Sequence, residues 1–220
     1  MKIQQRHRWS VTVEEAIAIQ QQLQAEVITT DQLGAVQYVA GVDVGFEEDG
    51  AVSKAAVVVL SFPDLQLQEQ AIALRPTTFP YTPGLLSFRE VPAILEALEK
   101  LTIVPDLILC DGQGIAHPRR FGLGCHLGLL TEVPTIGVAK SLFIGEHDEL
   151  ALAKGSWQAL QDRGEVIGAV VRSRANVKPI YVSVGHLISL PTAIDYVLGC
   201  TTKYRLPQTT RLADQLSRAA

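Results

Sequence analysis

Apolar residues recur along the chain at two spacings, one typical of helices and one typical of strands. In residues 12–30 they return every three or four positions, which places them on one face of a helix. Thr12 and Glu15 have the spacing of a capping box, so we predict that this helix begins directly after Thr12. Residues 38–46 are instead rich in β-branched side chains and predict a strand.

Two further strands are predicted after this one, at residues 55–62 and 65–74. The Pro63-Asp64 pair between them is a turn signal, so we expect the three strands to form an antiparallel meander with short connections. Residues 75–86 contain three prolines and a glycine, and they predict a loop of restricted conformation.

Beyond this loop the chain alternates between helices and strands. We predict a helix over residues 87–101, because Ser87 and Glu90 repeat the capping-box spacing. Residues 107–110 are wholly apolar and end at Asp111, as is typical of a buried parallel strand. The remaining predicted elements are helices near 120–130, 190–198 and 210–216 and strands at 135–138, 166–173 and 180–184.

The order of these elements predicts the fold class. A strand meander followed by helix–strand alternation indicates an α/β protein with one mixed sheet and helices on both faces, which is the plan of the ribonuclease H-like architecture. A chain of 220 residues is long enough to bury one sizeable core. We therefore expect residues 1–220 to form a single domain.

Composition narrows the class of protein further. Apolar residues make up 47% of the chain and charged residues 19%, which indicates a globular rather than a disordered protein. The apolar runs are too short to cross a bilayer, and none follows the basic start of the chain, so we expect neither a membrane span nor a secretory signal. The three cysteines are widely spaced, which argues against a disulfide framework and favours a cytoplasmic protein.

The net charge and the distribution of charge along the chain point to different partners. A net charge of −4 argues against a nucleic-acid partner, because contacts to phosphate dominate affinity for DNA. Acidic residues, however, outnumber basic ones in the first half of the chain, and the reverse holds in the second half. A basic cluster in the second half is a candidate surface for a nucleic-acid backbone, although each residue alone is better explained as a solvated charge. Its members are Arg172, Arg174, Lys178, Lys203, Arg205 and Arg211.

Asp43 is the first candidate for a chemical role. It stands in the middle of an apolar strand, where an ionised carboxylate costs several kcal/mol unless a cation pairs with it. The alternative is an outward-facing acid, as simple alternation along a strand allows. Gly41 and Gly45 flank Asp43 and favour a site where the backbone and a ligand come close together.

Three further acids are weak candidates one by one. Asp111 ends a buried strand, the edge at which α/β sheets bind ligands, but an Asp-Gly pair also begins many turns. Glu90 is explained by the capping box, and Asp214 is unremarkable by itself. With Asp43 they form a set of carboxylates suited to hard divalent cations, and two such cations can drive the hydrolysis of a phosphodiester.

Six segments together resemble the successive blocks of the endonuclease V family, the deoxyinosine 3′ endonucleases. The segments occur in the family's order and span about residues 38–214, so the set is far more specific than any one of them. They are VAGVDVGF at 39–46, FPYTPG at 79–84, LSFREVP at 86–92, DGQGIAHPR at 111–119, PTIGVAK at 134–140 and RLPQTTR at 205–211.

The resemblance implies a catalytic set. Asp43, Glu90 and Asp111 would be the principal metal ligands, for Mg²⁺ with Mn²⁺ as a substitute, and Asp214 would complete the cluster. Lys140 and His117 would lie near the scissile phosphate. The histidines at 126 and 186 receive no role from either line of reasoning.

The resemblance also implies a set of substrate contacts. Tyr81, between two prolines of which the first is Pro80, would be the tip of a wedge that enters the duplex, and stiffness suits that task. Without the resemblance, a loop aromatic packed on the core would be the commoner reading of Tyr81. Arg89 would support the site, and Gly84 with the backbone at Gly112 and Gly114 would shape a pocket for the displaced base.

The activity implied is Mg²⁺-dependent attack of water on the second phosphodiester bond 3′ to deoxyinosine, leaving a 3′-hydroxyl and a 5′-phosphate. The substrate would be double- or single-stranded DNA containing deoxyinosine, and inosine in RNA is an open possibility. The protein would act as a monomer, away from membranes. Two alternatives remain: another ribonuclease H-like nuclease acting on RNA or structured DNA, and a lesion-binding protein without catalysis.

Overall fold

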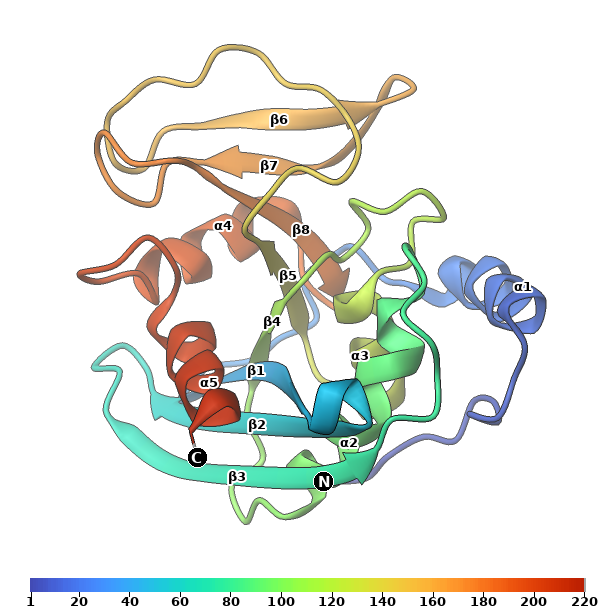
Figure 1. Cartoon of the computed structure of the whole chain (residues 1–220). Coiled ribbons are helices and arrows are strands. Elements are labelled where there is room, and N and C mark those ends of the chain that lie inside the picture. Colours follow the sequence, from blue (N-terminus) through green and yellow to red (C-terminus); the bar gives the residue numbers. More distant parts are fainter. Residues whose placement is uncertain (220) are drawn as a thin grey trace.

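One mixed sheet of eight strands runs through the molecule in the order β3-β2-β1-β4-β5-β8-β7-β6 (Figure 1). The structure is a computed structural model and describes residues 1–219. The elements lie along the chain as α1 (Val13–Leu23), β1 (Tyr38–Glu47), β2 (Val52–Ser61), β3 (Leu67–Pro76), α2 (Leu86–Glu99), β4 (Leu107–Asp111), α3 (Leu123–Thr131), β5 (Thr135–Ala139), β6 (Trp157–Asp162), β7 (Glu165–Val171), β8 (Ile180–His186), α4 (Leu190–Gly199) and α5 (Gln208–Arg218).

The predicted meander is confirmed, and it forms the three strands at one edge of the sheet. β1 pairs antiparallel with β2, and β2 pairs antiparallel with β3. β4 and β5 then continue the sheet in parallel with β1. β8, β7 and β6 complete it with antiparallel pairs, so the sheet is mixed as expected.

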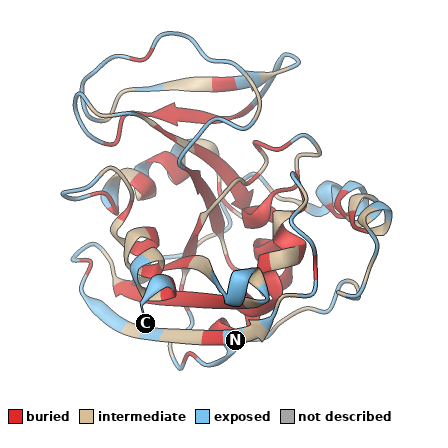
Figure 2. Ribbon diagram, viewed as in Figure 1, coloured by how far each residue is buried: buried red, intermediate tan, exposed pale blue. Residues whose placement is uncertain are grey.

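Helices cover both faces of this sheet, which confirms the predicted α/β class. α2 and α3 pack on one face and bury Ile94 and Leu127 against the strands. α4 and α5 pack on the other face with Ile194 and Ala213 (Figure 1). The central strands between the two layers are buried almost throughout (Figure 2). This burial explains why apolar residues follow one another at 107–110 of β4 and at 136–139 of β5 instead of alternating with polar ones.

The structure differs from the predictions in the end of one helix, in the cap of another and in one additional strand. The capping box of Thr12 and Glu15 is confirmed, but α1 ends at Leu23 rather than near residue 30. α2 begins at Leu86, and its N-cap position is taken by Leu85, whose side chain accepts no hydrogen bond, so the predicted Ser87–Glu90 box is wrong. The strand β6 was not predicted, because only one of its residues, Leu160, is buried and the segment carries little hydrophobic signal.

Candidate active site

Asp43 and Asp111 are brought together by the register of two parallel strands. Val42 on β1 pairs with Cys110 on β4, so the next residues along the two strands, Asp43 and Asp111, stand at the same level. Asp111 is the last residue of β4, and the strand ends of an open α/β sheet are where ligands bind.

Asp214 reaches the same place from α5, which crosses β1 at its two glycines. A Cβ atom at Gly41 would lie 2.2 Å from the backbone of Thr209, and one at Gly45 would lie 2.8 Å from the carbonyl oxygen of Ser217. Only glycine permits this approach, so the two glycines admit a helix backbone. The prediction that they mark the close approach of a ligand is therefore corrected.

The three aspartates form a cluster of carboxylates. One oxygen from each of Asp43, Asp111 and Asp214 lies within 4.8 Å of the others. Burial, and then the charges of Asp111 and Asp214, raise the pKa of Asp43 to about 6 against the opposing effect of Ser217, whose Oγ donates to Asp43 Oδ2 at 2.7 Å. Burial and the two neighbouring carboxylates thus make the ionised form of Asp43 costly unless a cation joins the cluster.

Glu90 is not one of these three residues, but it lies close enough for their charges to affect its pKa. Glu90 is 8% exposed, and burial followed by the charges of Asp43 and Asp111 raises its pKa well above the ordinary value. A carboxylate that neither caps its helix nor meets solvent is costly by itself, so its presence here suits a site that receives a cation.

Two basic side chains contact the aspartates. Lys140 follows β5 and places Nζ 2.5 Å from Asp111 Oδ2 and 3.5 Å from Asp214 Oδ1. Burial alone would lower the pKa of Lys140, but the three aspartates outweigh it and the pKa lies above its ordinary value. The Nη2 atom of Arg218, a well-exposed side chain one helical turn after Asp214, lies 2.8 Å from Asp214 Oδ1.

The residues present fit a hard divalent cation. Such ions take carboxylate oxygens as ligands, and the cluster supplies oxygens from three aspartates that no partner fully neutralises. The raised pKa of Asp43 comes first from burial and then from the charges of Asp111 and Asp214, and a bound cation would oppose both effects. Cysteine takes no part, because all three thiols are free and buried within the described part of the chain.

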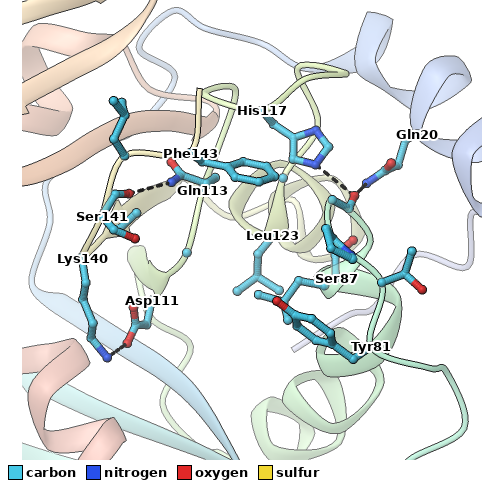
Figure 3. A pocket seen from close by; sticks show the side chains of 18 residues that line it. Gln20, Tyr81, Ser87, Asp111, Gln113, His117, Leu123, Lys140, Ser141 and Phe143 are labelled. Atoms are coloured by element: carbon cyan, nitrogen blue, oxygen red, sulfur yellow. Dashed lines mark hydrogen bonds and ion pairs between the residues drawn. The ribbon is translucent and has the colours of Figure 1, made fainter. Parts of the chain in front are cut away.

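A cavity of about 390 Å³ opens beside the cluster and is lined by Asp111, a member of the cluster, and by Lys140, which contacts Asp111 (Figure 3). Gly112 and Leu123 line it as well, and Ser87 lies on its wall. At its mouth Tyr81, with 73% of its surface exposed, and the half-exposed Phe143 come from two different loops. The carboxylates and an organic pocket are thus neighbours in one site.

The loop that carries Tyr81 is held at both ends. Phe79 is buried against Phe88, with ring centroids 5.6 Å apart. Gly84 has φ +79, a region that favours glycine, and its carbonyl oxygen accepts from Gln20 Nε2 at 3.0 Å and Arg119 Nη2 at 2.8 Å. The tip therefore projects from a fixed base.

His117 lines the cavity with both ring nitrogens engaged. Nε2 donates to the carbonyl oxygen of Gly84 at 2.9 Å, and Nδ1 accepts from the backbone N–H of Arg119 at 3.1 Å. Burial, and then the charge of Arg119, lower the pKa of His117 to about 4. The ring is thus neutral, and in the structure it braces the Gly84 loop.

Three residues that were expected to contact the substrate do not line the cavity. Arg89 donates to the carbonyl oxygens of Phe79 at 3.1 Å and Gly50 at 3.3 Å, so its guanidinium group supports the loop. Pro80 is exposed beside Tyr81. Gly114 is buried, and a Cβ atom there would lie 2.0 Å from the carbonyl oxygen of Val184, so this glycine allows the loop after β4 to pack on β8.

The basic cluster is divided by the structure. Arg172 is buried, and its guanidinium donates to the carbonyl oxygens of Leu150, Ala151 and Val177. Arg205 donates to the carbonyl oxygens of Lys140 and Pro179. These two arginines hold loops together, which leaves the other members as candidates for contacts to a nucleic-acid backbone: Arg174, Lys178, Lys203 and Arg211.

Several residues of the site carry little or no signal in the sequence. Gln20 is a buried glutamine on α1 that binds Gly84, and Ser217 follows Asp214 by three positions. Phe143 lies in the loop after Lys140. The contacts of these residues depend on partners far away along the chain. Only Ser217 could have been found, from its place one helical turn after an acid.

An eight-stranded mixed sheet of this order, with acids at the adjacent positions of β1 and β4 and on the last helix, defines a ribonuclease H-like α/β protein of the kind that carries a carboxylate metal site. The model of the Endonuclease V family matches residues 21–215. The chain belongs to the endonuclease V family, and it is accordingly an endonuclease, a hydrolase of phosphodiester bonds.

Relatives agree with this assignment over nearly the whole chain. Endonuclease V of Trichormus variabilis is 68% identical over 218 residues, which are 99% of each chain. The crystal structure of endonuclease V from Streptomyces avermitilis is similar with a TM-score of 0.91 and 43% identity, covering 99% of this chain and 96% of that one. Endonuclease V of Ciona intestinalis, in complex with a DNA containing an inosine followed by a ribo-adenosine, has a TM-score of 0.82 and 31% identity and covers 94% and 96% of the two chains.

Across residues 1–219, no helix has the length and apolar character that a bilayer crossing requires.

Proposed function

We propose that the protein is a DNA-repair enzyme that cuts DNA at deoxyinosine, at the second phosphodiester bond on the 3′ side, leaving a 3′-hydroxyl and a 5′-phosphate. The observation that carries this proposal is the cavity of about 390 Å³, which is lined by Asp111 of the carboxylate cluster and by Lys140, the lysine that contacts Asp111. If a displaced nucleobase occupied the cavity, the adjoining phosphodiester backbone of the DNA would lie beside the carboxylates. The Ciona intestinalis relative, whose structure contains inosine DNA, supports the choice of substrate.

Mg²⁺ is the proposed metal, with Mn²⁺ as a substitute, and Asp43, Asp111 and Asp214 would hold it with Glu90 close behind. The bound metal would supply activation of water and stabilisation of the leaving oxygen. Ser217 would fix the orientation of Asp43 through its hydrogen bond of 2.7 Å.

Lys140 would bind the scissile phosphate. Its ammonium group stands at the border between the cluster and the cavity, where the backbone of a bound strand would pass. A phosphate oxygen arriving there would share the ammonium with Asp111, since one Nζ has three donors. His117 would keep its bracing role on the neighbouring wall.

Tyr81 would open the duplex. Extruding a base costs least at a damaged or mismatched pair, and an aromatic wedge on a stiff loop lowers the cost further by replacing the lost stacking. The loop is held at its two ends by the contacts of Phe79 and Gly84, which gives it the stiffness that this task needs. We also propose that the protein works as a monomer in the cytoplasm, where its three buried thiols stay reduced.

The test is a cleavage assay on two labelled duplexes that differ by one base, deoxyinosine in one and deoxyadenosine in the other. With Mg²⁺ the first duplex should give a single product cut two bonds 3′ to the lesion, the second should stay intact, and EDTA should stop the reaction. The Asp43→Ala variant should still bind the inosine duplex without cutting it. Cleavage of both duplexes alike would favour a nuclease of another specificity, and binding without cleavage by the wild type would favour a lesion-binding protein.

A further inference from the structure

The last helix, α5, packs on β1 over two glycines that stand on either side of Asp43 (Figure 1). Gly41, Asp43 and Gly45 are alternate residues of β1, so they share one face of the sheet. The backbone of Thr209 meets Gly41, and that of Ser217 meets Gly45. The strand from 41 to 45 and the helix from 209 to 217 both span about 12–13 Å. The helix therefore runs in step with the strand, and its last turn lies beside Asp43.

The last turn of α5 supplies two groups to the carboxylate cluster. Ser217 Oγ donates to Asp43 Oδ2 at 2.7 Å. Asp214, one turn earlier on the helix, supplies the third carboxylate. The other two carboxylates are set by the pairing of β1 with β4 and do not depend on the helix. A shift of the last turn would thus change the shape of the cluster.

Lys54 on β2 holds this last turn from the neighbouring strand. It pairs with Gly45 across the two antiparallel strands, so its side chain points to the face that α5 covers. Its Nζ atom donates to the carbonyl oxygen of Ala219, the C-cap residue of α5, and lies 3.0 Å from Glu47 Oε1. A cation at the carboxyl end of a helix is stabilised by the carbonyl groups that remain free there.

Burial makes this contact costly to lose. The side chain of Lys54 is 9% exposed, against 48% for the surface residue Lys100. A buried ammonium group needs partners, and leaving it without them destabilises the fold. The side chain of Glu47 is 46% exposed and can move with the solvent, whereas the carbonyl group of Ala219 belongs to the helix. The contact with the helix end is therefore the one that fixes a position.

We propose that Lys54 is a positioning residue of the metal site, which it serves by holding the last turn of α5 against β1. The turn then presents Ser217 to Asp43 and Asp214 to the cluster. Among the described residues, Lys54 forms no ion pair with the acids of the cluster, so it acts through the helix. This inference rests on the proposed function, because it assumes that the cluster binds a divalent cation.

Lys54→Met is the main test, because it keeps the length of the side chain and removes its ammonium group. Mn²⁺ is titrated into the protein without DNA, and free Mn²⁺ is followed by electron paramagnetic resonance. The Kd for Mn²⁺ should rise by about ten-fold, the lower end of the loss expected when a partner that orients a metal ligand is removed. The Mn²⁺ concentration that gives half-maximal cleavage should rise by the same factor, and the rate at saturating Mn²⁺ should fall by less.

Hydrogen exchange in EDTA gives a readout that involves neither metal nor catalysis. In Lys54→Met the amides of residues 214–218 should exchange faster by about ten-fold, because a charged hydrogen bond at the end of their helix is lost. The amides of β4 should be accelerated less. Equal acceleration of both sets would show a general loss of stability and would overturn the positioning role.

Lys100→Met is the matched control, because Lys100 also joins a backbone carbonyl group to a glutamate. Its Nζ donates to the carbonyl oxygen of Ile72 at 2.9 Å and lies 3.8 Å from Glu96 Oε1. The affinity of this variant for Mn²⁺ should equal that of the wild type. Lys54→Arg keeps the charge and the N–H donors, so it should recover most of the affinity that Lys54→Met loses.

Gly45→Ala tests the seat of the helix without altering Lys54. The new Cβ would lie 2.8 Å from the carbonyl oxygen of Ser217 and would lift the last turn, so affinity for Mn²⁺ should fall here as well. Wild-type affinity in Lys54→Met, or in Gly45→Ala where Lys54→Met does not fold, would overturn the inference. Mn²⁺ binding by the wild type that Asp111→Asn leaves unchanged would instead overturn the proposed metal site.

Discussion

The Nζ atom of Lys140 lies 2.5 Å from Oδ2 of Asp111, at the point where the carboxylate cluster meets the cavity. The lysine therefore neutralises part of the charge that a metal would neutralise. It does so from the side at which a phosphate would arrive. One ammonium group thus links the two halves of the site.

Lys140→Gln should affect metal binding and cleavage differently. The variant loses the cation that competes for Asp111, so its affinity for Mn²⁺ should equal or exceed that of the wild type. Its rate of cleavage should fall by about 100-fold, the usual effect of removing one charge that stabilises a transition state. Metal titration and single-turnover cleavage measure the two quantities. Loss of metal binding together with activity would assign Lys140 to the metal site instead.

Tyr81→Ala should leave the fold intact and lower the affinity for duplex DNA. The side chain is 73% exposed, so the free energy of unfolding should change by less than about 0.5 kcal/mol. Affinity for an inosine duplex should fall roughly ten-fold, because one aromatic stacking contact is lost, and affinity for a single strand should fall less. Leu67→Ala, another exposed apolar residue, should change neither affinity. Equal losses for duplex and single strand would argue against a wedge.

Gly84→Ala should cost both stability and binding. The new side chain would adopt a left-handed conformation at about 1–2 kcal/mol, and its Cβ would lie 2.8 Å from Arg119 Nη2. Gly164 has φ +80 and open space around it, so Gly164→Ala should show the conformational cost alone. Thermal unfolding and duplex binding of the two variants check this. Two variants with the same affinity for DNA would show that the Gly84 turn does not shape the pocket.

His117 should make the protein less stable in acid. Its folded pKa of about 4 lies below its ordinary value of 6.5, so its contribution is present above pH 6.5 and is lost as pH falls towards 4. His117→Gln keeps an N–H donor for Gly84 but does not titrate. Between pH 6.5 and 4.5 the wild type should lose about 2 kcal/mol relative to the variant in chemical denaturation. Parallel stability curves would contradict the lowered pKa.

The sequence predicts the strands better than it predicts the connections between them. Asp43 and Asp111 each belong to an apolar strand, and the parallel pairing of these strands sets them side by side. The two glycines around Asp43 signalled a close approach, but the sequence could not tell a ligand from α5, since that contact joins residues 41 and 209.

Glu90 shows why local patterns fail at the site itself. Its spacing from Ser87 predicts a helix cap, yet Ser87 bonds to His126, which comes from another helix. The hydroxyl is thus taken by a partner 39 positions away, and Glu90 is buried where the charges of Asp43 and Asp111 raise its pKa. Arg172 and Arg205 were likewise read as surface charges because the loop carbonyls that bind them are visible only in three dimensions.

The most direct test of the account is where a metal binds. Crystals grown with Mn²⁺ and measured at its absorption edge should show an anomalous peak coordinated by carboxylate oxygens of Asp43 and Asp111, with Asp214 and Glu90 around it, and crystals of Asp111→Asn should show a weaker peak or none. A peak elsewhere, with Asp111 still paired to Lys140 alone, would contradict the claim that these acids form one metal site.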